Sequence, residues 1–212
     1  MALASYADLK TSIAGWLNRR DLTAVIPDFI RLAEDDLNSK LRDRRMLSRV
    51  EATVEEQPIA LPSDWIEAAR VAPEGGAPLE PVTLERLQEV RHDRRLPLML
   101  NAEATTGAPR FFAINGTVME FWPVPASPVV LEMTYYARLP RLTDAAPSNW
   151  LLEQDAAIYL YGALVQSAPY LKDDQRVVVW AGLYKDRIDT RNAASRSAAF
   201  NGGALKRVRR GF

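Results

Sequence analysis

The chain has 212 residues, of which 48% are hydrophobic and 25% are charged, values typical of a globular protein with one core, or one core and an insertion. Its 27 Lys and Arg residues are balanced by 27 Asp and Glu residues, which argues against sequence-independent DNA binding by the body of the protein. The absence of cysteine excludes disulfides, thiolate zinc sites and a cysteine nucleophile.

The sequence carries no recognisable membrane or export signal. The segment Met1–Asp8 lacks the basic and apolar regions of a signal peptide. The longest apolar run, Ala156–Val165, is too short to span a bilayer. We therefore expect a soluble protein made in the cytoplasm.

The N-terminal region predicts two helices joined by a polar break. Ser5 is a suitable cap for the first helix, and Pro27 suits the first turn of the second. Apolar residues recur at helical spacing in both segments. They are Tyr6, Leu9, Ile13, Trp16 and Leu17 in the first, and Phe29, Ile30, Ala33, Leu37 and Leu41 in the second.

From about residue 49 the apolar residues alternate, which is typical of half-buried strands. Val50, Ala52 and Val54 predict one strand, with residues 58–61 as its return partner. Residues 74–78 predict a loop, residues 83–91 a short helix, and residues 96–107 mostly loop. Further along, Val129, Leu131, Met133 and Tyr135 predict another strand.

The clearest local pattern is a β-hairpin over residues 110–122. We expect Asn115-Gly116 to form a two-residue type I′ turn, because both positions of that turn need positive φ. The hairpin carries four aromatic residues with two open interpretations: core on one face and contact surface on the other, or core alone. As a contact surface it would face the tail or a neighbouring subunit; the four residues are Phe111, Phe112, Phe121 and Trp122.

Helical spacing returns after Pro140. Asn149 or Ser148 can cap a helix to about Ser167, whose apolar character on most sides predicts a central position. Asp173-Asp174 suits the cap and first turn of a last helix. In that helix the apolar face comprises Val177, Trp180, Ala181, Tyr184 and Ile188.

These elements predict an α+β fold. We expect N- and C-terminal helices, residues 1–45 and 138–195, to form one helical bundle. Residues 46–137 would form a small, mainly antiparallel β insert, and residues 196–212 an extended C-terminal arm.

Groups suited to catalysis are scarce in this sequence. His92 is the only histidine; beside Asp93 it is a formal candidate for a general base, but a solvated loop histidine is the favoured interpretation. The acidic pairs at 35–36, 55–56 and 173–174 do not converge by spacing, because neighbours on a helix diverge by about 100°. No glycine motif indicates a nucleotide, so we predict no enzyme activity, metal or cofactor.

The C-terminal end is basic and carries apolar residues. It has three open interpretations: a solvated end, a nucleic-acid arm, or an arm that becomes ordered on a protein partner. In the last interpretation the partner-binding residues are Phe200, Leu205, Lys206, Arg207, Val208, Arg209, Arg210 and Phe212.

Several segments resemble phage adaptor proteins, the head-to-tail connectors of short-tailed phages, similar in layout to tail tubular protein A. The resemblance covers about residues 5–190 and its motifs are structural. They are Ser5–Leu9, Leu61–Trp65, Tyr135–Pro140, Asn149–Leu152, Tyr159–Leu164 and Ala168–Asp174.

This resemblance implies a structural virion protein in the neck between head and tail. It implies a ring, usually of twelve subunits, that docks under the portal protein and meets the tail nozzle or tail tube protein. Transiting DNA would pass through the ring, and the C-terminal arm would reach into the portal. No catalytic residue follows from the resemblance.

Two other hypotheses make different predictions. A small DNA-associated packaging accessory protein would use the basic tail, and its DNA binding would be salt-dependent and lost with residues 204–212. A hydrolase would lose its activity with His92→Ala. The adaptor hypothesis predicts neither.

Overall fold

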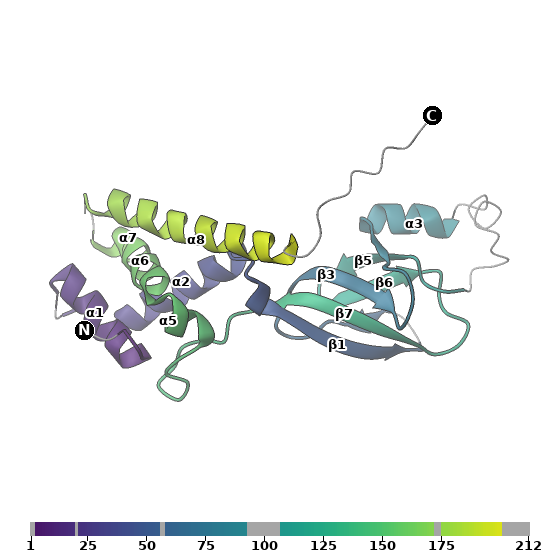
Figure 1. The fold of residues 1–212 in the computed structure, drawn as a ribbon, viewed down its shortest axis with the longest axis horizontal. Coiled ribbons are helices and arrows are strands. Elements are labelled where there is room, and N and C mark those ends of the chain that lie inside the picture. Colours follow the sequence, from purple (N-terminus) through teal and green to yellow (C-terminus); the bar gives the residue numbers. More distant parts are fainter. Residues whose placement is uncertain (1–2, 20, 56–57, 93–106, 172–174, 201–212) are drawn as a thin grey trace. The chain divides into compact units, whose positions relative to one another are not determined.

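The computed structural model describes residues 3–19, 21–55, 58–92, 107–171 and 175–200. In this part of the chain it contains seven α-helices and two mostly antiparallel sheets, which confirms the α+β class (Figure 1). The chain divides into two compact units. A helical unit comprises residues 1–44 and 139–212, and a β unit comprises residues 45–138.

The helical unit begins with the two predicted helices. α1 spans Tyr6–Leu17, and the Ser5 side chain accepts a hydrogen bond from the Asp8 amide as its cap. α2 spans Ile26–Lys40 with Pro27 in its first turn. Both predictions are confirmed except at Trp16, which is about half exposed on the flank of α1.

The second half of the helical unit contains α5 (Trp150–Gln154), α6 (Ala156–Gln166), α7 (Ala168–Leu171) and α8 (Val177–Phe200). The single helix predicted after Asn149 is therefore wrong, because the chain leaves helical geometry at Asp155, whose φ is −148°. The predicted arm also begins too early, since α8 continues beyond residue 195 to Phe200.

Helix α6 lies centrally, as its apolar character predicted. It packs against α1, α2 and α8, and most of its side chains are buried (Figure 1). Gly162 allows close packing of α6 against its neighbours, because a Cβ there would lie 3.0 Å from the Tyr184 ring and 3.2 Å from the Ala33 Cβ. A larger residue at this crossing would force the helices apart.

The β unit contains a three-stranded sheet in the order β1-β7-β3. β1 (Leu47–Val54), preceded by the 3₁₀ turn Arg44–Met46, and β7 (Val129–Ala137) were predicted, whereas β3 (Trp65–Pro73) was not. β7 pairs antiparallel with both neighbours, and its pairing with β3 shifts register twice. Such irregularities disrupt the alternation by which a strand is recognised in sequence.

The second sheet has the order β2-β6-β5-β4. Its strands are β2 (Ile59–Ala60), β4 (Glu80–Pro81), β5 (Phe111–Asn115) and β6 (Val118–Trp122). β2 pairs with β6, so the prediction that residues 58–61 return along β1 is wrong. The short helix predicted for residues 83–91 is confirmed as α3 (Leu84–His92), which contacts β5 and β6.

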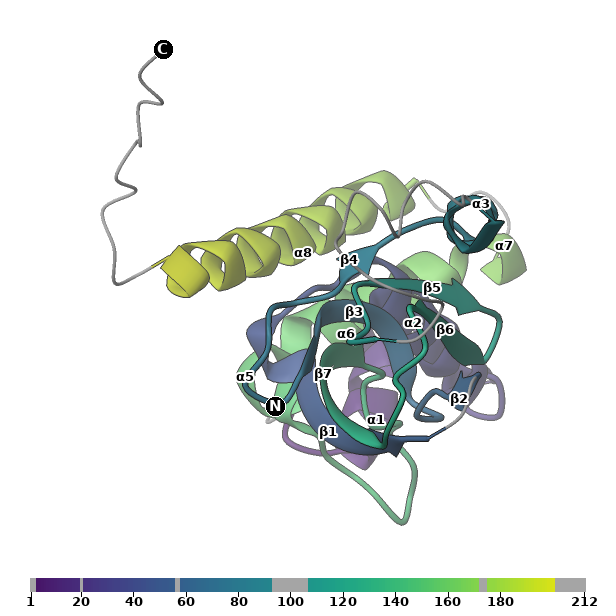
Figure 2. The same cartoon turned by 90° about the vertical axis from the view of Figure 1, so that its right-hand side faces the viewer.

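The ribbons of the two sheets curve around a common region (Figure 2), and residues from both sheets belong to one apolar core. Its members include Val54, Val71, Phe112, Phe121, Leu131 and Met133. Because the core is formed by alternate residues of β1, β5, β6 and β7, the other faces of these strands are free to carry polar or contact residues.

Candidate interaction surfaces

Polar side chains of α2 hold the chain where it re-enters the helical unit. The buried Asn38 accepts a hydrogen bond from the Leu139 amide at 2.8 Å, and one turn earlier the buried Glu34 accepts one from the Leu142 amide at 2.8 Å. These bonds satisfy backbone groups that would otherwise be buried without a partner. Neither role is recognisable from the sequence, because the hydrogen-bond partners of Asn38 and Glu34 lie about a hundred positions away.

Glu34 is a carboxylic acid in an apolar setting. Burial raises its pKa to about 7, against the opposing effects of the Leu142 amide and the Arg141 charge. The side chain therefore changes charge near neutral pH inside the helical unit. The charged form is unfavourable there because it has lost most of its contact with water.

Side chains of α8 bind the segment that follows α2, where the chain first leaves the helical unit. Asn192 accepts a hydrogen bond from the Arg42 amide at 2.7 Å and donates one to the Lys40 carbonyl at 3.0 Å. The Ser195 hydroxyl accepts one from the Arg44 amide at 2.7 Å. Residues near 195, predicted to border a free arm, are therefore part of the structural framework.

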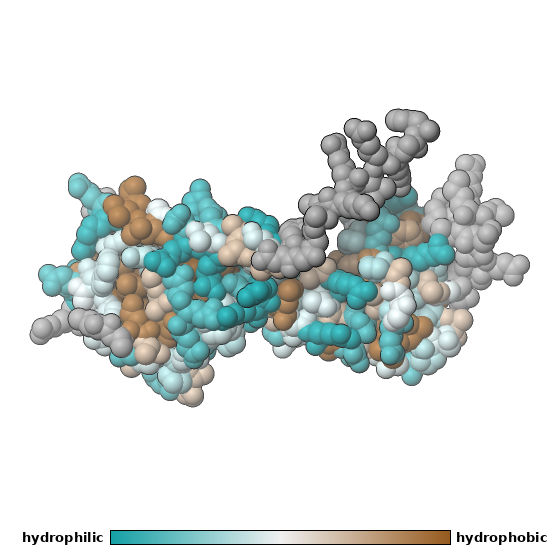
Figure 3. Space-filling model, viewed as in Figure 1, coloured by the Kyte–Doolittle hydropathy of each residue, from teal (hydrophilic) through white to brown (hydrophobic). Residues whose placement is uncertain are grey.

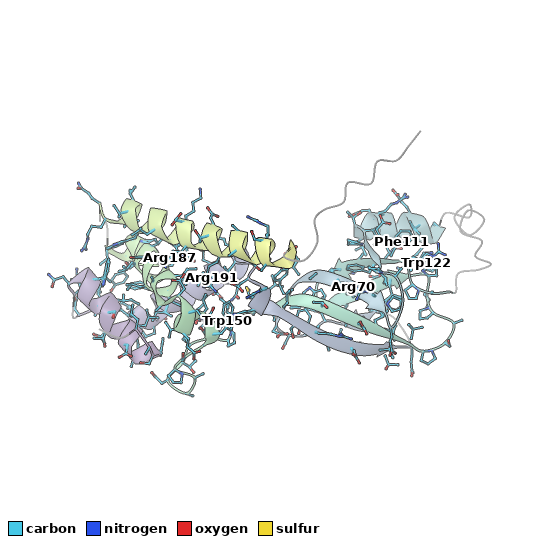
Figure 4. All side chains as sticks on the ribbon, in the orientation of Figure 1. Arg70, Phe111, Trp122, Trp150, Arg187 and Arg191 are labelled. Carbon is cyan, nitrogen blue, oxygen red and sulfur yellow. The ribbon has the colours of Figure 1, made fainter. Side chains whose placement is uncertain are left out.

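Arginines of α8 also fix the break between α5 and α6. Arg187 pairs with Asp155 at 2.9 Å, and Arg191 pairs with Asp43 at 2.9 Å. The Arg191 guanidinium lies 5.6 Å from the centre of the Trp150 ring (Figure 4). α8 thus connects residues that follow α2 with the α5–α6 junction.

The beginning of α8 exposes an apolar surface. Trp180 is only 3% exposed, but Val178, Val179 and Leu183 are 79%, 62% and 41% exposed. Figure 3 shows apolar side chains at the surface where α8 begins. The sequence signal was the run Val177–Trp180, since four consecutive helical residues point in all directions and cannot all be buried.

The hairpin contains one buried and one half-buried aromatic pair. Phe112 and Phe121 lie opposite each other and belong to the core, which excludes them from a contact surface in the folded protein. Phe111 and Trp122 also lie opposite each other and are half-buried (Figure 4). The interpretation of core on one face and contact surface on the other remains open only for this second pair.

The turn of the hairpin differs from the prediction by one residue. Asn115 pairs with Val118, so the loop residues are Gly116 and Thr117. Gly116 has a φ of +61° and Thr117 does not have a positive φ. This sign pattern is that of a type II′ turn, in which only the first loop position requires glycine.

Charged groups secure α3 to the outer side of the hairpin. Arg91 forms an ion pair with Glu120 at 2.7 Å, and the side-chain amide of Asn115 donates a hydrogen bond to the same carboxylate at 3.2 Å. The Asn115 hydrogen bond, and then Arg91, lower the pKa of Glu120 below its ordinary value. The neighbouring His92 is exposed at the end of α3, and its Nδ1 lies 2.7 Å from the Gln88 carbonyl oxygen.

The remaining residues singled out in the sequence do not converge on a reactive centre within the described part of the chain. Asp35 pairs with Arg141 and Asp36 with Lys40. In the described ranges no group of three or more His, Cys, Asp or Glu residues is placed to hold a metal ion. Among the described helices, none is both long and apolar enough to cross a membrane.

Several predicted positions lie outside the described residues. They include residues 96–106 of the predicted loop, Asp173 and Asp174, and the arm residues from Leu205 to Phe212. Of the predicted arm, residues 196–200 are described, and they form the end of α8.

The helical unit thus combines internal polar contacts with an exposed apolar surface at the start of α8. A comparison with protein families identifies the class. The family model described as SU10 adaptor protein matches residues 4–207, nearly the whole chain. The chain belongs to this family, which confirms the resemblance to phage head-to-tail adaptors and makes it a structural component of the virion. In a comparison with curated proteins, no protein matched the chain.

Proposed function

We propose that this adaptor forms a ring, usually of twelve subunits, between the portal protein and the tail nozzle or tail tube, and that DNA passes through its channel. The observation that carries the proposal is the family match over residues 4–207. The exposed apolar residues at the start of α8 support it, because such surface is normally covered by another protein. A ring of identical subunits needs two different contact surfaces on each subunit.

The C-terminal segment is the proposed portal-binding arm. Four basic side chains lie within positions 206–210, flanked by Leu205, Val208 and Phe212. Such a segment can become ordered on a partner by burying its apolar side chains and pairing its charges. The half-buried Phe111 and Trp122 form the proposed contact with the tail or a neighbouring subunit.

Binding to the portal protein of the same phage tests the proposal. The full chain should co-sediment with portal particles, and a chain ending at Phe200 should bind much more weakly. Substitution of the four basic residues alone by serine, with the apolar residues kept, separates charge pairing from apolar anchoring. Full binding by the shortened chain would contradict the role of the arm.

A DNA-binding assay distinguishes the adaptor from a packaging accessory protein. Without the four basic residues at positions 206–210 the chain has more acidic than basic residues, so the body of the adaptor should bind duplex DNA weakly and without a steep dependence on salt. Tight binding that falls steeply with salt and disappears without residues 204–212 would support the accessory protein instead.

A further inference from the structure

A groove lined by residues of α2, α6 and α8 is a feature of the helical unit that the proposed function leaves unused. Its volume is about 460 Å³, and its lining is mainly apolar. Its apolar lining residues are Val165, Ala181 and Ile188, here called the apolar floor. A hollow of this size has room for several side chains, since a single water molecule occupies only about 30 Å³.

Two polar contacts lie along the groove. The Tyr184 hydroxyl donates to Asp36 at 3.0 Å, and the Asn192 side-chain amide donates to the Lys40 carbonyl at 3.0 Å. Along α8 these contacts are eight residues apart, or about 12 Å at about 1.5 Å per residue. The groove is therefore long enough for about two turns of another helix.

Two acidic and two basic side chains line the groove: Asp36, Asp189, Lys40 and Lys185. Asp36 is engaged by Lys40 and Tyr184. Asp189 lines the groove, is exposed, and has no ion-pair partner within the described residues. A basic residue on an incoming segment would find a partner there.

The sequence that follows α8 has the complementary pattern. Leu205, Val208 and Phe212 are spaced i, i+3 and i+7, so they would share one face of a short helix. That face would extend about 10 Å, close to the length of the groove. Lys206, Arg207, Arg209 and Arg210 would lie beside it, within reach of the rim.

The length of the chain also fits. From Phe200 to Leu205 the backbone spans at most about 17 Å, which reaches back past Asn192 along α8. A helical turn and a half beyond Leu205 brings the segment towards Ala181, about 28 Å from Phe200 along α8. The same chain can therefore place its C-terminal segment along its own groove.

We propose that in the free subunit this groove holds the chain's own C-terminal segment, with Leu205, Val208 and Phe212 on the apolar floor. The biological meaning rests on the proposed function, because the same segment is the proposed portal arm. Release from the groove would then precede portal binding, and the free subunit would keep its arm shielded until a portal competes for it.

Engineered cysteines test this directly, since the natural chain has none. The test variant carries Ala181→Cys in the groove and Gly211→Cys in the segment. The control variant carries Thr190→Cys, on the other flank of α8, with the same Gly211→Cys. Thr190 is closer to the end of α8, so a freely moving segment would cross-link to it at least as readily as to Ala181.

We expect the test variant to form an intramolecular disulfide several-fold faster than the control under mild oxidation, with circular dichroism confirming that both are folded. Adding Leu205→Asp and Phe212→Asp should reduce the rate to that of the control. Equal rates in the test and control variants, or disulfides mainly between two chains, would overturn the proposal. Because the experiment uses free protein without a portal, failure to bind the portal would leave its result unchanged.

Discussion

The two units of this adaptor are built in different ways. The β unit is formed by one continuous stretch, residues 45–138, around an apolar interior. The helical unit combines residues 1–44 with residues 139–212, and its chain crossings are held by buried or half-buried polar side chains such as Asn38 and Asn192. A unit assembled from distant segments thus adds specific hydrogen bonds between those segments to its apolar packing, whereas strand pairing joins the segments of the continuous unit.

The largest effect should come from the apolar core of the β unit. Phe121→Ala should lower the free energy of unfolding by about 3–5 kcal/mol, because Phe121 is fully buried between the sheets. Phe111→Ala, on the half-buried pair, should cost only about 1 kcal/mol. Chemical denaturation of both variants measures the difference, and equal losses would contradict the assignment of the two faces.

The next effect depends on pH and belongs to the helical unit. The pKa of Glu34 is raised in the folded protein to about 7 from an ordinary value of 4.5, so the folded state binds more protons between these values. The contribution of Glu34 to stability is present below about pH 4.5 and is lost as pH rises through about 7. The loss should amount to up to about 3 kcal/mol.

Glu34→Gln is the matched variant, because the amide oxygen can still accept the Leu142 hydrogen bond. As pH rises from 5 to 8, the free energy of unfolding of the wild type should fall relative to that of this variant. Denaturation measurements at several pH values in this range test the prediction. A constant difference would show that Glu34 does not titrate there.

Asn149→Ala should have a somewhat smaller effect. Asn149 caps α5 through the Leu151 and Leu152 amides and donates to the Pro140 carbonyl and the Tyr159 hydroxyl. Losing the cap and these partners should cost about 2–3 kcal/mol. The control is Ser148→Ala, whose exposed bond to Glu153 should be worth less than about 0.5 kcal/mol. Chemical denaturation of both variants measures the difference. Similar midpoints of unfolding would contradict the role of Asn149 as a cap and hydrogen-bond donor.

Asn38→Ala tests a single fastening bond. It leaves the buried Leu139 amide without its acceptor, at an expected cost of about 1–2 kcal/mol. Ser39→Ala removes an exposed hydroxyl from the same helix and should be close to neutral. Thermal unfolding of both variants measures the difference. Equal unfolding temperatures for Asn38→Ala and Ser39→Ala would contradict the stabilising role of the bond to Leu139.

The smallest effect on stability should come from the exposed face of α8. Val179→Ala should change the free energy of unfolding by less than about 0.5 kcal/mol, whereas Trp180→Ala removes a buried side chain. Binding assays with the portal protein and with the adaptor itself then show whether Val179 contributes to association. A large loss of stability in Val179→Ala would mean that this surface is packed in the free subunit.

Sequence reasoning recovered the elements whose patterns are local. The spacing from Phe29 to Leu37 predicted α2, and the alternation from Val129 to Tyr135 predicted β7. β3 was missed because its register shifts break the alternation, and the end of α5 was missed because Asp155 is not a strong helix breaker. The hairpin was recognised, but its turn was displaced because Asn115 also tolerates positive φ.

The interaction surfaces were harder to predict than the fold. The split of the hairpin into a core pair and a half-buried pair followed from alternation, but the identity of the core pair required the second sheet. The groove between α2 and α8 and the bonds of Glu34 and Asn192 join residues more than a hundred positions apart. No local pattern announces such contacts, since they depend on how the helices pack.

The central claim is that this protein acts by assembling on other virion proteins. Electron microscopy of the purified chain mixed with the portal protein of the same phage tests it most directly. The account predicts a ring of adaptor subunits bound to the portal around an open channel. Portal particles that remain bare at saturating adaptor concentration would contradict it.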